Sequence, residues 1–517
     1  MKKTISLIMV LAMLKVLLLC PMSVSADPSW SGASKITSST TVDSESYSSS
    51  SADENALLVS GSISVTLSNI TANKTGSSSG GDDTSFYGIN SAIIAKDGAS
   101  LTISNATITT DATGANGVFS YGGSATTNNT SSDGTTVTIS DSTITTTEDS
   151  SGGIMTTGGG IMNASNLTVT TAGISSAAIR TDRGGGTVTV DGGTYTTTGA
   201  GSPTIYSTAD VTVSNADLIS ETAEGIVIEG KNTVTIDSCN LVDSNTKLNG
   251  QSTTYKNIFL YQSMSGDADE GNSTFTASNS TITTNNGDSF YVTNATAVIN
   301  LENNTIVNND SSGNLLRAQA DSWGNSGSNG GDVTLNATNQ ALSGTVVIDS
   351  ISTLQMNLSE SSSFEGIINA DDSAESITLT LDETSTIKLT GDSYVSELNN
   401  SDEANSNIDL NGYSLYIDGT AIEATATTTA TTAEETTEAV EETEEESTGL
   451  TTAQIVIIVA VIAVIVVVII VVALKKRKKD GVTVEEVPEE VKEPDNINEP
   501  DKIEEPENTK DSDNTSE

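Results

Sequence analysis

The sequence predicts an all-β protein built as a right-handed parallel β-helix, and the main observation behind this is a repeated phrase. LTISNATI at Leu101–Ile108 returns along the chain, and copies that start at Val188, Val211 and Val234 lie 23 residues apart. Further copies start at Val137, Phe275 and Ile299, with larger gaps that indicate loop insertions or a degenerate copy. A period of this length is typical of a solenoid, and parallel crossovers are almost always right-handed.

The phrase itself predicts strands with a bend between them. Its positions 1, 3 and 8 are apolar, as in Leu101, Ile103 and Ile108. Alternation over positions 1 to 3 is typical of a strand with one buried face, but five further residues would turn position 8 to the other face. We therefore expect a bend at positions 4 and 5, with the Asn or Asp of position 5 stacked as an inward or turn-lining ladder. A second apolar pair before most copies, such as Ile226 and Ile228, adds a third strand to each coil.

Composition excludes several classes of function. The 517 residues contain no histidine, which removes Ser-His-Asp and Cys-His catalysis and imidazole metal sites. The formal charge of −47 makes nucleic acid an improbable partner, because phosphate recognition needs Lys and Arg. Of two cysteines, Cys20 lies in the leader and Cys239 in a phrase copy, where we expect a buried, inert thiol.

The ends of the chain predict export and membrane anchoring. Lys2 and Lys3, an apolar stretch and the small residues before Asp27 are typical of a secretory signal peptide. The run Ile455–Leu474 is uninterrupted Ile, Val, Ala and Leu, long enough at ~1.5 Å per residue to span a bilayer. The basic cluster Lys475–Lys479 follows and predicts a cytoplasmic C-terminus.

The expected order of segments follows from these boundaries. It is a signal peptide (1–26), a polar lead-in (27–55), the β-helix ectodomain (56–420), a Thr/Glu-rich stalk (421–453), one transmembrane helix (454–474), and a basic stop-transfer cluster with an acidic disordered cytoplasmic tail (475–517). We therefore expect a single-pass protein of the cell membrane with an extracellular N-terminal ectodomain.

Three segments are more specific than the repeated phrase: WGNSGSNGG (Trp323–Gly331), LTGDSYVSELNN (Leu389–Asn400) and IDLNGYSLYIDG (Ile408–Gly419). They resemble a family of exported Gram-positive bacterial β-helix surface proteins, described as pectin-lyase-like adhesins or carbohydrate-binding proteins. The resemblance implies a surface role and, in some members, polysaccharide binding assisted by calcium. It supplies no catalytic motif that transfers to this chain.

The alternative of a pectin-lyase-like polysaccharide lyase or hydrolase depends on one basic pair. Such a lyase would use carboxylate-held calcium and an Arg or Lys base. Arg180 and Arg183, with Asp182 between them, form the densest basic pair of the ectodomain, but a solvated loop pair explains them equally well.

Candidate binding residues fall in the insertions between phrase copies. Asp267, Asp269 and Glu270 place three carboxylates on one Gly-bounded loop, which suits a possible calcium ion, although no cofactor is required. Exposed aromatic side chains are the usual platforms for sugar rings. The aromatic candidates near insertions are Phe86, Tyr87, Tyr255, Tyr261 and Trp323.

The sequence therefore favours a non-enzymatic, membrane-anchored adhesin or polysaccharide-binding protein whose partner is an extracellular polysaccharide or a host or cell-surface glycan. A membrane-tethered lyase or hydrolase and a structural surface-coat protein stay open as alternatives. Fold alone selects none of them.

Overall fold

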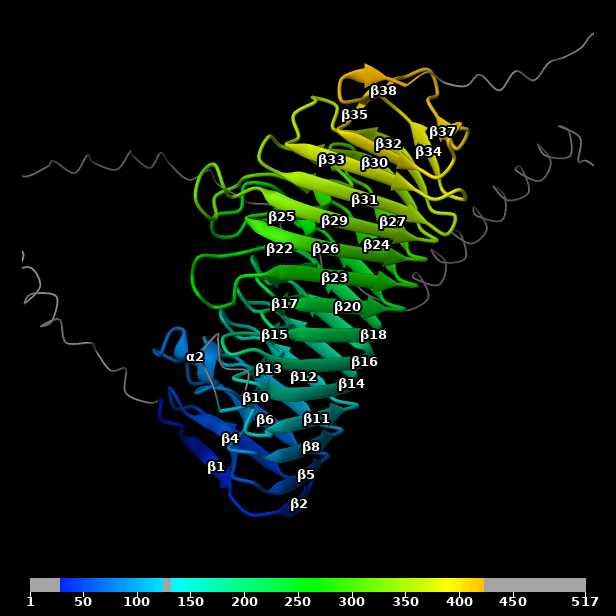
Figure 1. The fold of residues 1–517 in the computed structure, drawn as a ribbon. Coiled ribbons are helices and arrows are strands. Elements are labelled where there is room, and N and C mark those ends of the chain that lie inside the picture. The colour runs from blue at the N-terminus through cyan, green and yellow to red at the C-terminus, as the bar shows by residue number, and fades with distance from the viewer. Residues whose placement is uncertain (1–27, 124–131, 423–517) are drawn as a thin grey trace, which may run out of the picture. The chain divides into compact units, whose positions relative to one another are not determined.

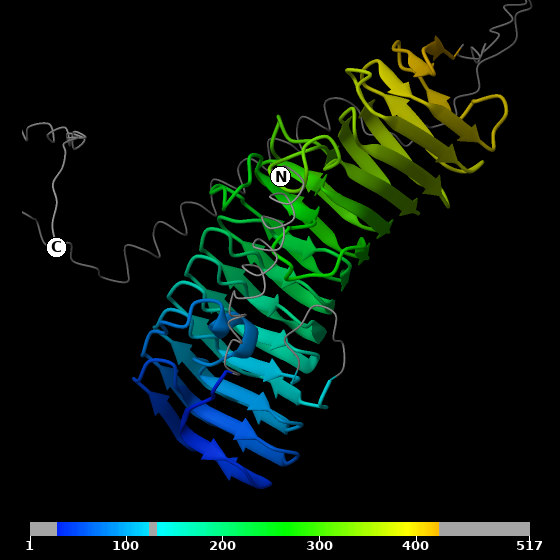
Figure 2. The same ribbon diagram turned by 60° about the vertical axis from the view of Figure 1, so that its left-hand side comes forward.

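The computed structural model describes residues 28–123 and 132–422, which form a parallel β-solenoid (Figures 1 and 2). Sheet A has 15 strands and sheet B has 21, and each coil adds strands to both sheets. All pairings within these two sheets are parallel, with each strand bonded to the equivalent strands of the coils before and after it. The predicted all-β class and its parallel repeat are therefore confirmed.

Sheet A contributes one strand per coil. Its strands are β1 (Gly32–Ile36), β4 (Asn55–Ser60), β7 (Ile93–Lys96), β10 (Val118–Tyr121), β13 (Ile154–Thr157), β15 (Ile179–Thr181), β17 (Ile205–Ser207), β19 (Ile226–Glu229), β22 (Lys256–Tyr261), β25 (Asp288–Thr293), β28 (Leu316–Ala318), β30 (Ala341–Ile348), β32 (Ser363–Ile368), β34 (Thr386–Leu389) and β37 (Ile408–Asp409).

Sheet B contains the repeated phrase as two short strands or one longer bent strand. Its strands are β2 (Thr40–Asp43), β3 (Ser46–Ser49), β5 (Ser64–Ser68), β6 (Thr71–Lys74), β8 (Ser100–Ser104), β9 (Thr107–Thr110), β11 (Thr136–Ser140), β12 (Thr143–Thr146), β14 (Gly160–Thr171), β16 (Gly186–Thr197), β18 (Asp210–Ser220), β20 (Thr233–Asp237), β21 (Asn240–Asp243), β23 (Asn272–Ser278), β24 (Thr281–Thr284), β26 (Ala295–Glu302), β27 (Thr305–Asn308), β29 (Gly331–Thr338), β31 (Thr353–Ser359), β33 (Ser376–Leu381) and β36 (Glu397–Asn400). The degenerate copy expected between Val137 and Val188 is MNASNLTV, starting at Met162 on β14.

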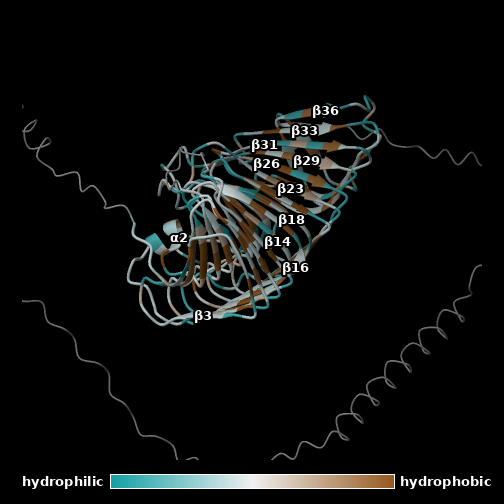
Figure 3. Cartoon of the chain, turned by 90° about the horizontal axis from the view of Figure 1, so that it is seen from below, coloured by the Kyte–Doolittle hydropathy of each residue, from teal (hydrophilic) through white to brown (hydrophobic). Residues whose placement is uncertain are grey.

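The core lies between the two sheets and runs through every coil. Phrase positions 1, 3 and 8 point inward, as in Val137, Ile139 and Ile144, all with 0% exposure. The alternate residues of sheet A, such as Ile179 and Ile205, face them. Figure 3 shows the hydrophobic residues on the strands, while the turns are hydrophilic.

The predicted bend occurs at phrase position 5, which adopts left-handed backbone. Asn105, Asp141 and Asn215 have φ of 52°, 49° and 57°. Asn and Asp tolerate this region because their short side chains bond locally. The side chains line the turn on the outside, and Asn303 Nδ2 donates to Asn279 Oδ1 of the previous coil at 2.9 Å. The ladder is therefore turn-lining, not inward.

Replacing Asn105 by valine should lower the free energy of unfolding by about 1–2 kcal/mol, because a β-branched residue is strained at positive φ. Asn105→Gly is the matched control and should change stability by much less, since glycine adopts this φ without strain. Urea unfolding of both variants checks the difference. Equal stability of the two variants would show that the turn relaxes around valine.

The segment expected to be a loose lead-in is part of the solenoid. β1, β2 and β3 occupy residues between Gly32 and Ser49 and pair with β4, β5 and β6. This segment is rich in serine, so its few inward-facing apolar residues do not stand out in the sequence. Val42 and Tyr47 are two of them, and they pack against the end of the core. The prediction of a polar lead-in over 27–55 is therefore wrong.

The C-terminal coils end in a small third sheet. It contains β35 (Ser393–Val395), β38 (Leu415–Ile417) and β39 (Thr420–Ala421), and β39 runs antiparallel to β38. This strand covers the edge of β38, as expected of a terminal cap. Within the two described ranges, no helix has the length and apolar character needed to cross a membrane. The predicted signal peptide, membrane span and tail lie outside the described residues, as does the stalk from residue 423 on.

Candidate functional site

The outward face of sheet A carries a column of large side chains, one from each of ten successive coils between β4 and β28. The central residue of each strand points outward, because alternation turns its neighbours into the core. In register along the sheet, the column runs Leu58, Ile94, Phe119, Met155, Arg180, Tyr206, Val227, Phe259, Tyr291 and Arg317. Most of these side chains are apolar, so we expect other segments of the chain to pack over them and shield them from water.

The N-terminal part of this column is covered by a short helix and a tryptophan. Helix α2 (Asp83–Tyr87) and Trp30 pack over Leu58, Ile94 and Phe119. The Trp30 indole donates to the Tyr87 carbonyl at 2.8 Å, and Lys96 Nζ lies 4.2 Å from the Trp30 ring centre. Phe86 and Tyr87, predicted as ligand contacts, are thus part of this cover.

The C-terminal part of the column is covered by Trp323. Its ring centre lies 5.3 Å from that of Phe259 and 5.2 Å from that of Tyr261. Phe259 and Tyr261 stack on each other at 4.4 Å with an interplanar angle of 14°. Trp323 and Tyr261, predicted from separate insertions, therefore meet in one aromatic cluster.

Two adjoining hollows lie between these covers. Their volumes are about 220 and 270 Å³. Both are lined by Gly201, Pro203, Tyr206, Asn249 and Tyr261. Arg180 lines only the first hollow, and Trp323 and Glu224 line only the second. We call the two hollows together the sheet A groove.

A buried carboxyl group holds the aromatic floor of the groove in place. Glu229, at 1% exposure, accepts hydrogen bonds from the hydroxyls of Tyr206, Tyr261 (2.9 Å) and Ser263. Burial raises the pKa of Glu229, and the three hydroxyl donors act in the opposite direction. The same carboxyl thus orients two ring platforms from the coils on either side of its own.

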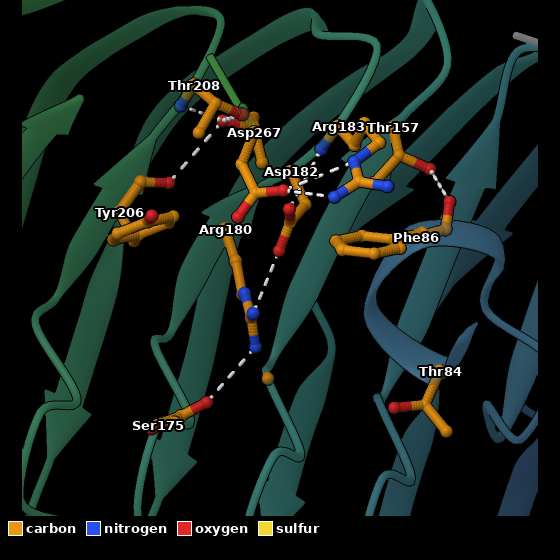
Figure 4. A network of polar contacts seen from close by, with 12 residues as sticks. Thr84, Phe86, Thr157, Ser175, Arg180, Asp182, Arg183, Tyr206, Thr208 and Asp267 are labelled. Carbon is orange, nitrogen blue, oxygen red and sulfur yellow. Dashed lines mark hydrogen bonds and ion pairs between the residues drawn. The ribbon is translucent and has the colours of Figure 1, made fainter. Parts of the chain in front are cut away.

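The predicted catalytic group is divided between two separate ion pairs (Figure 4). Arg180 donates to Asp182 at 2.8 Å and to the Ser175 carbonyl at 3.1 Å. Arg183 instead pairs with Asp267 at 2.6 Å and lies 3.9 Å from the Phe86 ring centre. Burial raises the pKa of Asp182, with the Arg180 charge opposing it. Both guanidinium groups are therefore engaged by carboxylates, and only Arg180 lines the groove.

The three carboxylates predicted to hold calcium do not face one point. Asp267 is bound by Arg183 and shares with Asp269 a hollow beside Gly184, whereas Glu270 lines a different hollow beside Asn294. In the part of the chain that the structure describes, no three potential ligand residues of the His, Cys, Asp or Glu type gather around a common point. This loop as arranged does not fit a calcium ion.

No family model, no curated protein and no solved structure matches this chain. The resemblance to exported β-helix surface proteins therefore stays a prediction.

Sequence reasoning missed several groove residues. Tyr206 and Ile205 form one of the apolar pairs that precede the phrase copies, but only Ile205 points inward. Glu229 and Asn249 carry no motif. Alternation within IRT, IYS and IVIE could have placed Arg180, Tyr206 and Val227 outside in one column. Tyr255, at 36% exposure, lines neither hollow.

Proposed function

We propose that this protein is a non-enzymatic surface protein, anchored by one membrane span, that binds an extracellular glycan in the sheet A groove. The aromatic cluster beside polar groups supports this proposal most strongly, because sugar rings stack on aromatic faces while their hydroxyls bond polar side chains. Tyr206, Tyr261 and Trp323 supply the faces. Asn249 and Ser252 supply polar groups from the loop at the edge of the groove.

The two adjoining hollows suit two consecutive sugar rings. Arg180 retains guanidinium N–H groups beyond those bonded to Asp182 and Ser175, and it lines the first hollow. Pairing of Arg180 with Asp182 offsets its charge, so we expect recognition by hydrogen bonding rather than by charge attraction.

A glycan panel tests this function. The purified full chain is assayed on plant, mucin and microbial polysaccharides, with product release monitored in parallel. We expect binding without depolymerisation, and at least about a tenfold loss of affinity, or about 1.4 kcal/mol, in Trp323→Ala and Tyr206→Ala. Tyr413→Ala, which removes an aromatic ring that is 43% exposed outside the groove, is the matched control.

The other outcomes distinguish the alternatives. Depolymerisation that disappears in Arg180→Ala would replace this proposal with a lyase or hydrolase. If Tyr413→Ala weakens binding as much as Trp323→Ala does, the binding site does not lie in the groove. Absence of binding to every glycan would favour a structural coat protein.

A further inference from the structure

One inner column of the solenoid contains an acidic residue between coils that have hydroxyl groups at the same position. Phrase position 10 is a buried hydroxyl residue in six coils, Thr110, Thr146, Thr171, Thr197, Ser220 and Thr284. It is the buried Lys74 in the coil before Thr110 and the half-buried Asn308 in the coil after Thr284. These hydroxyls can donate to a carbonyl at the corner toward sheet A, as Thr146 does to Ser151 and Ser220 to Ala223. At the same position, β21 ends with Asp243.

Asp243 has no donor that satisfies it. Its side chain is 0% exposed, and neither carboxyl oxygen has a hydrogen-bond partner of acceptable geometry. Burial raises the pKa of this carboxyl well above its usual range, although the Asn245 backbone N–H acts in the opposite direction. An isolated buried carboxylate is costly, so a partner of opposite charge would stabilise this corner.

Two amide oxygens beside Asp243 are unpartnered in the same way. Asn245 and Asn257 are both 0% exposed, and the Oδ1 of each lacks a donor. Their orientation is fixed by their nitrogens, since Asn245 Nδ2 donates to the Lys256 carbonyl at 2.9 Å and Asn257 Nδ2 donates to the Thr283 carbonyl at 3.3 Å. Rotation of either amide would break these bonds.

The pairing of the coils brings these groups together. Thr284, which also accepts a hydrogen bond from Asn257 Nδ2, is the register partner of Asp243 on the neighbouring strand β24. Asn245 follows Asp243 by two residues in the same turn and reaches Lys256, the residue before Asn257. Four unpartnered oxygens therefore lie at one corner between neighbouring coils.

Neighbouring charges leave this corner negative. Glu224, which faces Asp243, is compensated by Lys256 at 3.6 Å. Lys256 also faces Asp288, which is held by Arg317 at 2.6 Å. The charge of Asp243 therefore has no counterpart among these neighbours.

We propose that Asp243, Asn245 and Asn257 bind an alkali-metal cation inside the solenoid. All four unpartnered oxygens of these three side chains are hard acceptors, which suit a cation rather than an anion. These four oxygens, two of them from the single carboxylate, are too few for Ca²⁺, which takes six to eight oxygens. The cation takes the place that a hydroxyl group occupies at position 10 of the two adjoining coils, and it is independent of the proposed glycan site.

Thermal unfolding of the detergent-solubilised full chain tests this site. The Tm is measured at mildly alkaline pH in sodium, potassium or choline chloride of equal ionic strength. We expect the Tm to rise with the logarithm of sodium or potassium concentration but not with choline, because a ligand of the folded state stabilises it by mass action. Asp243→Thr, which restores the column hydroxyl, should lose this dependence. Asp217→Asn, at an exposed position of the previous coil, should retain it.

Several results would overturn the proposal. An equal Tm in all three salts would show that a proton or a water molecule satisfies Asp243. A sodium dependence that persists in Asp243→Thr would place the cation elsewhere. Crystals of the wild-type chain soaked in rubidium chloride give an independent readout, since the proposal requires an anomalous peak beside Asp243, and the absence of that peak would also overturn it.

Discussion

Replacement of Glu229 by alanine is expected to lower the affinity of the groove for its glycan by at least about tenfold. It should also destabilise the fold by about 1–3 kcal/mol, because the buried Tyr261 hydroxyl is left without an acceptor. Tyr206, Tyr261 and Ser263 all donate to this carboxyl. Without it, the two rings lose their common anchor, and the loop that carries Ser263 is released from the sheet. The affinity for whichever glycan of the panel binds the wild type measures the first effect. Hydrogen exchange of residues 262–271 measures the second.

Glu229→Gln is the matched variant, because it keeps an acceptor oxygen and removes the charge. We expect it to bind within a few-fold of the wild type. The raised pKa of Glu229 also sets the direction of a pH effect. A carboxyl whose pKa is raised on folding stabilises the fold fully below its unfolded pKa, and this contribution is lost as pH rises through the folded pKa.

The stability of the wild type relative to Glu229→Gln should therefore fall as pH rises, and the two should converge in acid. Urea unfolding over a pH series measures it. Wild-type affinity in Glu229→Ala would show that packing alone orients Tyr206 and Tyr261, and a constant stability difference across the pH series would contradict the charge argument.

Replacement of Phe290 by alanine should cost about 3–5 kcal/mol, because it empties the centre of one coil. Phe290 is fully buried on β25, and its ring centre lies 6.1 Å from that of Phe275 across the interior. Coils of a solenoid contact only their neighbours, so the damage should loosen one part of the stack before the rest. We expect urea unfolding to become broader or biphasic, with early hydrogen exchange in the coils around β25.

Val307→Ala is the control for this cavity. Val307 lies on β27 with 37% exposure, so its truncation should change stability by no more than about 0.5 kcal/mol. A single sharp transition in Phe290→Ala, shifted as a whole, would show that the solenoid unfolds as one cooperative unit.

The repeat was predictable because its information is local. Val137, Ile139 and Ile144 alternate with polar residues, and Asn105 marks the bend within the same phrase, so each copy predicts its own strands. The first coil was missed because Ser and Thr outnumber the apolar residues there, although Val42 and Tyr47 keep the inward positions. The acidic residue Asp243 is seen to be unusual only when the phrase copies are aligned, because its register partners Ser220 and Thr284 carry hydroxyl groups.

Candidate ligand residues were harder to predict because their neighbours come from other coils. Trp323 and Tyr261 were chosen as aromatic residues near insertions, and they do meet. Arg180 and Arg183 were grouped because they are close in sequence, but one faces the groove and the other reaches Asp267, 84 residues away. The spacing of the two arginines in the sequence does not indicate that their side chains have different partners.

The sequence by itself determined the parallel β-solenoid, the bend at position 5 and the inward residues, because strand alternation and turn propensity act over a few residues and repeat in every coil. Only the tertiary structure decided where a ligand could bind. The groove is made of single outward residues from successive coils, covered by insertions of different lengths. Its shape depends on how those insertions fold back onto sheet A, and on the one carboxyl, Glu229, that fixes two of its rings.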